Sequence, residues 1–286
     1  MHNNLQRRHF IKSSAFGLIG ITSFGFASAN EIGSRMRIPG SNKDPLFYRY
    51  PSMNDNLVSG IVGASHANFE KVKELVGQRP ELAGASWDWG FGDWETALGA
   101  ASHVGRRDIA EYLMSNGARP DIFTFAMLGM VKSVQEIIET VPGIQSHRGP
   151  HGITLLQHAK NRLESKTITA EDKANVSKVI VYLESVGNAD IKATSLEITE
   201  EEKQKYFGEY RFGDGEGEVF VVDQHRLKFL QVARKGSSPR ALHFVGEKTF
   251  SPAGASNVKL IFKMEGDKAV SFGIHEPEPM VIAVRV

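Results

Sequence analysis

The chain has 286 residues, of which 41% are hydrophobic and 23% are charged, which is ordinary for globular protein and enough for two modest domains. Its formal net charge of +1 shows no basic excess that would indicate a nucleic-acid or anionic-membrane partner. Cysteine is absent, which excludes disulfides, thiolate metal sites and a cysteine nucleophile.

Residues 1–29 have the layout of an export signal. A polar start with Arg7 and Arg8 precedes an apolar run from 16 to 26 and the small residues Ala-Ser-Ala at 27–29. The run is shorter than the ~20 residues of a membrane span, so contact with a membrane is expected only transiently, through this segment. Beyond residue 29 the chain has 31 basic and 33 acidic residues, so the expected mature protein is slightly acidic.

The stretch QRRHFIK at 6–12 resembles a twin-arginine signal, in which a paired arginine is followed by a variable residue, Phe, an aliphatic residue and often Lys. The alternative is a general secretory signal with incidental arginines. The resemblance implies a periplasmic or otherwise exported protein that crosses the membrane folded, sometimes with a cofactor aboard. Whether the signal is cleaved or kept as an anchor stays open.

Residues 30–56 are rich in Gly, Pro, Asn and Ser, and they predict an extended leader. From 57 to 190 the apolar spacing is helical and repeated. Residues 191–206 predict a linker with one short capped helix, and 207–286 alternate as short strands. The expected fold class is therefore α+β multidomain, with a helical repeat region followed by a small antiparallel β-barrel.

The stretch TALGAASHVGRRDIAEYLMSNGARPD, residues 96–121, contains two short amphipathic helices. It resembles an ankyrin repeat, which the following residues match in position: Thr96, Leu98, Ala101, Gly105, Asp108, Ile109, Leu113, Gly117 and Ala118. Ala97 and Gly99 depart from the usual Pro and His of that pattern. Neighbouring segments keep the register, since Ala64-Ser65-His66 aligns with Ala101-Ser102-His103 and a further copy opens at 154–159. About four stacked repeats are expected, enough to bury a continuous core.

The C-terminal segment opens with Gly208-Glu209-Tyr210 and continues as seven short alternating stretches such as GEVFVVDQ and VKLIFKME. It resembles the lipocalin-like domain appended to some periplasmic bacterial hydrolases. The resemblance covers roughly the last eighty residues, and it implies a small antiparallel barrel. Alternation alone suits many other all-β folds.

All three tryptophans lie in WDWGFGDW, residues 87–94. In ankyrin geometry this loop projects beside the concave recognition face, and clustered aromatics dominate binding hot spots and stack on sugar rings. The predicted binding residues here are Trp87, Asp88, Trp89, Phe91, Asp93 and Trp94. The alternative is that the rings fold back to close the end of the repeat stack, with the aspartates forming turns or caps.

The second group of candidates is the histidines. Because His66 and His103 occupy the same place in adjacent repeats, we expect them to be neighbours in space, and His147, His151 and His158 lie in or after one Gly-rich loop. Stacked repeats could gather His103, His151, His158 and Asp93 around zinc, but no tight ligand spacing such as HExxH appears. Solvated or hydrogen-bonded histidines are the simpler interpretation, so no metal site, cofactor or catalytic residue is predicted.

The function that these patterns favour is non-catalytic binding by an exported ankyrin stack, which engages a protein or a carbohydrate-like ligand through the tryptophan loop and the five histidines. The alternative is a metal-dependent or barrel-ligand-binding enzyme, or an enzyme accessory, in the periplasm. A third interpretation makes the barrel a lid or a dimerisation surface. Fold resemblance does not identify the partner, and the sequence leaves the oligomeric state open.

Overall fold

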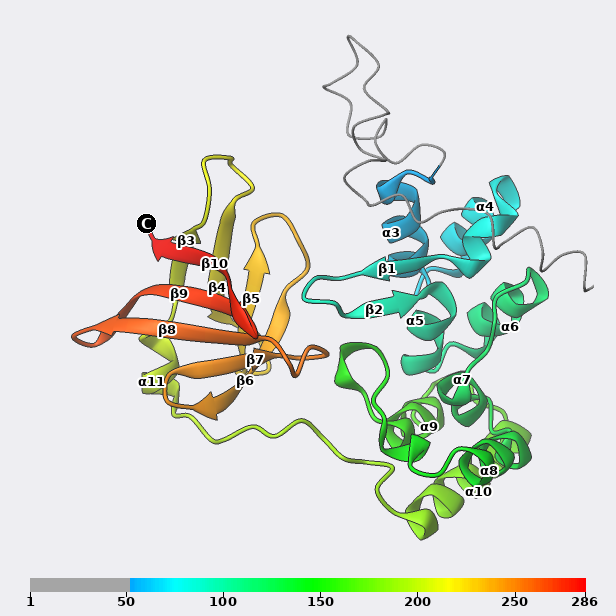
Figure 1. Ribbon diagram of the computed structural model, residues 1–286. Coiled ribbons are helices and arrows are strands. Elements are labelled where there is room, and N and C mark those ends of the chain that lie inside the picture. Colours follow the sequence, from blue (N-terminus) through cyan, green and yellow to red (C-terminus); the bar gives the residue numbers. More distant parts are fainter. Residues whose placement is uncertain (1–51) are drawn as a thin grey trace, which may run out of the picture. The chain divides into compact units, whose positions relative to one another are not determined.

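The structure is a computed structural model that describes residues 52–286, and within them helices are followed by a β-barrel (Figure 1). The predicted signal at 1–29 and most of the predicted leader lie outside the described residues. The α+β class with a barrel is thereby confirmed, whereas the assignment of the helices to an ankyrin stack stays a proposal. None of the helices among residues 52–286 combines the length and apolar character needed to cross a membrane.

The helical region consists of four consecutive pairs of helices. The first helices of the pairs are short and contact one another in series: α3 touches α5, α5 touches α7, and α7 touches α9. The pairs are α3 (Asp55–Ala64) and α4 (Phe69–Gln78), α5 (Ala97–His103) and α6 (Arg107–Ser115), α7 (Ile122–Met127) and α8 (Val131–Thr140), and α9 (Leu155–Leu163) and α10 (Ala170–Val186). Three 3₁₀ turns lie between them: η2 (Pro80–Gly84), η3 (Ile144–Ser146) and η4 (Pro150–Gly152).

Side-chain caps set where these helices begin. Thr96, Thr154 and Thr169 each accept a hydrogen bond from the backbone N–H three residues later, at the starts of α5, α9 and α10. Such a cap satisfies one of the backbone donors that a helix start leaves unpaired. Every residue of α5 is buried, so this short helix lies in the middle of the helical core.

A two-stranded hairpin precedes α5. Its strands are β1 (Ser86–Asp88) and β2 (Trp94–Thr96), which pair antiparallel with Trp87 opposite Glu95. Along β2 the burial alternates, with Trp94 exposed and Glu95 buried, because successive side chains of a strand point to opposite faces. We call residues 86–96 the tryptophan hairpin.

After the short helix α11 (Glu200–Gln204), eight antiparallel strands close into a barrel by pairing in sequence order, with the last strand meeting the first. They are β3 (Gly208–Arg211), β4 (Val219–Gln224), β5 (Leu230–Arg234), β6 (Arg240–Gly246), β7 (Thr249–Pro252), β8 (Lys259–Glu265), β9 (Lys268–Glu276) and β10 (Glu278–Arg285). Tyr210, Phe250, Phe262 and Phe272 pack against one another in the barrel core. Closure removes the open sheet edges that would otherwise invite pairing with another chain.

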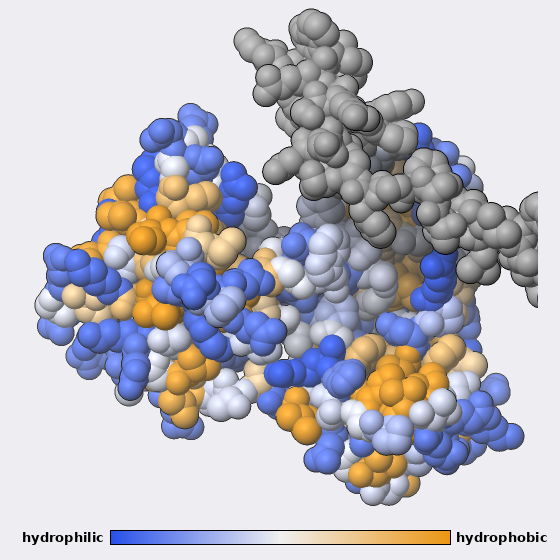
Figure 2. Space-filling view, viewed as in Figure 1, coloured by the Kyte–Doolittle hydropathy of each residue, from blue (hydrophilic) through white to orange (hydrophobic). Residues whose placement is uncertain are grey.

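The outside of the barrel carries exposed apolar side chains on its last strand. Met280, Ile282 and Val284 alternate along β10 and are each more than half exposed, and Val286 continues the series. Figure 2 shows hydrophobic residues gathered on the barrel near the C-terminal end of the chain. On the opposite face of the same strand Ala283 is buried and Val281 is partly buried.

Candidate functional site

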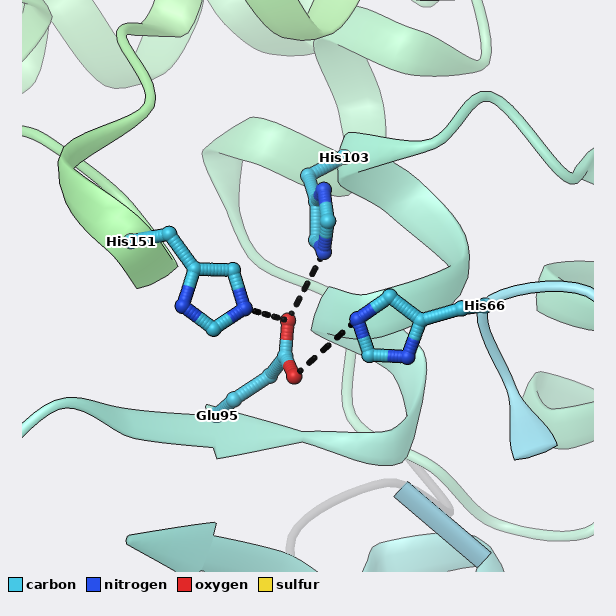
Figure 3. A group of neighbouring side chains, drawn as sticks. All are labelled: His66, Glu95, His103 and His151. Carbon is cyan, nitrogen blue, oxygen red and sulfur yellow. Dashed lines mark ion pairs between the residues drawn. The ribbon is translucent and has the colours of Figure 1, made fainter. Parts of the chain in front are cut away.

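Four side chains from separate segments converge beside the start of α5: His66, Glu95, His103 and His151 (Figure 3). Each offers one ligand atom, and these atoms all lie within 4.8 Å of one another. His66 follows α3, Glu95 is on β2, His103 ends α5, and His151 lies in η4. We call these four residues the histidine–glutamate cluster.

The Glu95 carboxylate lies at the centre of the cluster. Its Oε1 is 3.0 Å from Nε2 of His103 and 3.4 Å from Nε2 of His151, and its Oε2 is 3.5 Å from Nε2 of His66. The side chain of Glu95 is fully buried, whereas about a quarter of the His66 and His151 side chains is exposed. The cluster is therefore closed on the Glu95 side and reachable from solvent on the side of His66 and His151.

Glu95 Oε1 and His103 Nε2 are buried and have no hydrogen-bond partner among residues 52–286, although the two atoms lie 3.0 Å apart. Buried polar atoms are nearly always paired, and an exception calls for an explanation such as an ion. Both of these atoms belong to the set that could hold a metal.

Contacts behind the imidazoles fix which nitrogen faces the cluster. Nδ1 of His66 lies 3.2 Å from the carbonyl oxygen of Val62 and 3.1 Å from that of Gly63. Nδ1 of His151 lies 2.6 Å from Oδ2 of Asp93. Because carbonyl and carboxylate oxygens only accept, each Nδ1 carries a proton, and Nε2 is the nitrogen that faces Glu95, with a lone pair there whenever the ring is neutral.

Asp93 holds His151 from two directions, since its Oδ1 also accepts from the His151 backbone N–H at 2.9 Å. His151 itself has a left-handed backbone, with φ of 60°, which is costly for a residue with a Cβ and persists only where the surroundings impose it. Arg240 of the barrel pairs with Asp93. Nη1 of Arg240 also lies 2.7 Å from Nδ1 of His151, but both groups are donors, so Asp93 is the acceptor for the two of them.

The charges of the cluster stabilise one another. Burial raises the pKa of the Glu95 carboxyl, but interactions with His103 and His151 outweigh burial and hold that pKa below its usual range. Burial lowers the pKa of His151, but the carboxylates of Asp93 and Glu95 outweigh it and raise the pKa to about 9. For His66, burial dominates and lowers the pKa. A carboxylate and a neighbouring imidazolium thus coexist inside the protein.

The structure places several predicted site residues here. His66 and His103 are neighbours, as the repeat register predicts, with ring centroids 4.9 Å apart. His151 joins them, and Asp93 acts through it. Trp89 turns toward the cluster and donates from Nε1 to Glu95 Oε2 at 2.6 Å.

The other predicted residues lie outside the cluster. Asp88 accepts from the Gly90 backbone N–H and forms a turn, Trp94 is 64% exposed, and His147 is exposed. Phe91 packs against the barrel core. His158 is fully buried against Phe123, with Nδ1 on the Thr154 carbonyl.

Glu95 is the member of the cluster that sequence patterns do not single out. One feature of the sequence could have indicated that Glu95 is buried. It lies between Trp94 and Thr96 in a short strand that leads into α5, and because side chains alternate along a strand, the middle residue points inward. A carboxylate at an inward position needs a buried partner. Without knowing which residues of the hairpin pair with each other, Glu95 cannot be distinguished from an exposed glutamate in a loop.

No family model matches the chain, nor does any curated protein or solved structure. The site is therefore interpreted from its own geometry.

His158 predicts a pH dependence of stability. Burial lowers the pKa of its imidazole to about 4, from 6.5, and the hydrogen bond to Thr154 opposes this only in part. Between these two values the unfolded chain binds a proton that the folded chain does not, so the free energy of unfolding should fall as the pH falls from 6.5 to 4, by up to about 3 kcal/mol. His158→Asn keeps a donor for the Thr154 carbonyl and should remove this contribution. Urea denaturation of the two metal-free proteins from pH 4 to pH 7.5 measures the difference, and parallel curves would contradict the prediction.

Proposed function

We propose that this protein binds one divalent transition-metal ion through His66, Glu95, His103 and His151, and that zinc is the first ion to test. The observation that carries the proposal is the convergence of three imidazole nitrogens and one carboxylate within 4.8 Å, two of whose atoms are buried without a hydrogen-bond partner in the described part of the chain.

The donor set fits zinc chemically. Imidazole nitrogen and carboxylate oxygen are both common zinc ligands, and four ligands complete a tetrahedral shell. With bonds of about 2.0–2.1 Å, a tetrahedral ion separates its ligand atoms by about 3.4 Å. The contacts of 3.0 and 3.4 Å from Glu95 Oε1 to His103 and His151 are of this size, and the 3.5 Å contact of His66 is with the second oxygen, Oε2. The complete set of four ligand atoms lies within 4.8 Å. One carboxylate would offset half of the charge of the ion.

The hydrogen bonds behind the ligands support the same function. A histidine that ligates a metal usually donates its other N–H to a carboxylate or a carbonyl, which orients the ring and raises its basicity. His151 has such a partner in Asp93, and His66 has Val62 and Gly63. A histidine that only formed hydrogen bonds with solvent would not need a second hydrogen bond to orient its ring.

We further propose that the scaffold is an ankyrin-type stack in an exported, periplasmic protein with a lipocalin-like C-terminal barrel. The register of the repeats at 96–121 and the resemblance of residues 6–12 to a twin-arginine signal support this assignment. Export in the folded state would allow the ion to be loaded before the protein crosses the membrane. In this proposal the helices supply rigid positions for ligands that are far apart in the chain.

A second candidate is a metal-dependent enzyme or enzyme accessory. The observation that favours it is the partial exposure of His66 and His151, which leaves one side of the cluster open to a water molecule or a substrate. A metal-bound water with a lowered pKa is the usual nucleophile of such sites. Substitution by Co²⁺ separates the two candidates, since its visible spectrum distinguishes a four-coordinate ion from one with an added ligand.

The test is titration of the metal-free protein with Zn²⁺ by calorimetry, with elemental analysis of the loaded protein. We expect one ion per chain and a dissociation constant below about 1 µM, which corresponds to about 8 kcal/mol. Zinc at 100 times that constant should add about 2.7 kcal/mol to the free energy of unfolding. His103→Ala should abolish tight binding.

His147→Ala is the matched control, because His147 is an exposed histidine of the same loop as His151 and is not in the cluster. It should bind zinc like the unmodified chain. Equal loss in both variants would indicate scattered surface binding and would overturn the proposal, as would zinc binding at several sites of similar affinity.

A further inference from the structure

A second cavity, of about 460 Å³, lies between the tryptophan hairpin and strands β4 to β6 of the barrel. Trp87, Trp89 and Phe91 line it from the hairpin, and Phe220 lines it from the barrel. The ligands of the histidine–glutamate cluster are not among its lining residues. Its chemistry is therefore separate from the proposed metal site, although Trp89 borders both.

The cavity also has a buried cation at its edge. Arg240 lines it and is only 7% exposed. One end of its guanidinium pairs with Asp93, but its Nε is buried and finds no hydrogen-bond partner among the residues that the structure describes. A buried N–H of a charged group that lacks an acceptor is costly, and a ligand that brought an acceptor would remove that cost.

Aromatic walls and a cation with an unused donor select one kind of ligand. Flat rings and the apolar faces of sugars stack on indole, and carboxylates accept strongly from guanidinium groups. The hydroxyls of Ser237 and Ser238 line the same cavity and can take part in polar contacts. The volume is within the range of small-molecule sites.

We propose that this cavity binds a small ring-bearing carboxylate. The ring stacks against Trp87 and Trp89, and the carboxylate pairs with the guanidinium of Arg240, which lines the cavity. An aromatic acid and a sugar acid share this chemistry. The inference stands apart from the proposed metal site, because it rests on different residues and on a different unpaired atom.

The experiment measures binding of benzoate and glucuronate to the full chain, with benzyl alcohol and glucose as the neutral counterparts. Because all three tryptophans lie within residues 87–94, selectively excited tryptophan fluorescence reports this hairpin alone, and calorimetry confirms the stoichiometry. We expect at least one of the two carboxylates to bind at least tenfold more tightly than its neutral counterpart. The better carboxylate identifies the ring as aromatic or as a sugar.

Two variants test the contacts. Trp87→Ala removes a wall of the cavity and should weaken binding at least tenfold, whereas Trp94→Ala, which removes an exposed indole of the same hairpin outside the cavity, should not. Arg240→Gln should abolish the preference for the carboxylate over the neutral compound. Zinc titration of each variant shows whether the metal site is intact, so failure of one site is distinguishable from failure of the other. Equal binding of charged and neutral compounds, absence of binding by all four, or an unchanged affinity in Trp87→Ala would overturn the inference.

Discussion

Glu95→Gln is expected to weaken zinc binding about 1,000-fold, which corresponds to about 4 kcal/mol. Glu95 is the one carboxylate of the histidine–glutamate cluster and contacts all three imidazoles. Glutamine has nearly the same size and can still accept from Trp89, so the hairpin should keep its position. The variant lacks the negative charge that attracts the ion and a strong anionic ligand. Calorimetric titration with Zn²⁺ gives the affinity of each protein.

Two further variants allow the loss of zinc affinity in Glu95→Gln to be compared with smaller expected losses. Asp93→Asn should weaken zinc binding only 10–100-fold, because Asp93 orients His151 and does not itself face the ion. Glu74→Gln, at an exposed glutamate paired with Lys71, should leave the affinity unchanged. If Glu95→Gln loses less than tenfold, or less than Asp93→Asn, Glu95 is not a ligand of the ion.

Gly105→Ala is expected to lower the free energy of unfolding by about 4 kcal/mol. Gly105 has a left-handed backbone with φ of 72°, which costs about 1–2 kcal/mol for a residue with a Cβ. An added Cβ would also lie 2.9 Å from the Asn161 carbonyl oxygen and 2.9 Å from Cα of Arg162. These are backbone atoms of α9, so they cannot rotate away, and forcing such a contact costs a further 1–3 kcal/mol or so. Urea denaturation measures the change.

Gly117→Ala is the matched control. Gly117 also has a positive φ, of 95°, but an added Cβ there meets no atom within 4 Å. Its cost should be only the left-handed penalty of about 1–2 kcal/mol, so the difference between the two variants isolates the contact with α9. Zinc affinity should fall as well in Gly105→Ala, since Asn161 donates to the His103 carbonyl beside this glycine. Equal losses of stability in the two variants would contradict the close contact.

Local patterns predict much of the fold because their causes are local. Thr96 and Thr154 cap helices that begin where their sequence places them, and Gly117, with its positive φ, follows the end of α6. Alternating strands after residue 206 predict the barrel, which the structure confirms as eight closed strands. Its closure depends on pairing between β3 and β10, which are about seventy residues apart, so alternation alone leaves a barrel and a curved sheet equally possible.

The candidate site is predictable only in part. His66 and His103 occupy equivalent places in adjacent helix pairs, so the repeat register alone makes them neighbours. The same register says nothing about His151, which reaches the cluster from a loop with a left-handed backbone and is held by Asp93 from 58 residues away. His158 looks similar in sequence, yet it packs against Phe123 and stays outside the cluster.

The sequence by itself determined the order of the helical region and the barrel and the proximity of His66 and His103, because these depend on neighbours along the chain or on a repeated register, whereas it did not predict the strands β1 and β2. Only the tertiary structure decided that Glu95 faces inward, that His151 joins it, and that Arg240 of the barrel pairs with Asp93. These contacts join segments that are far apart in the chain, and no repeat or periodicity in the sequence relates their positions. Burial then makes each contact strong, since a charge removed from water must find its partners inside the protein.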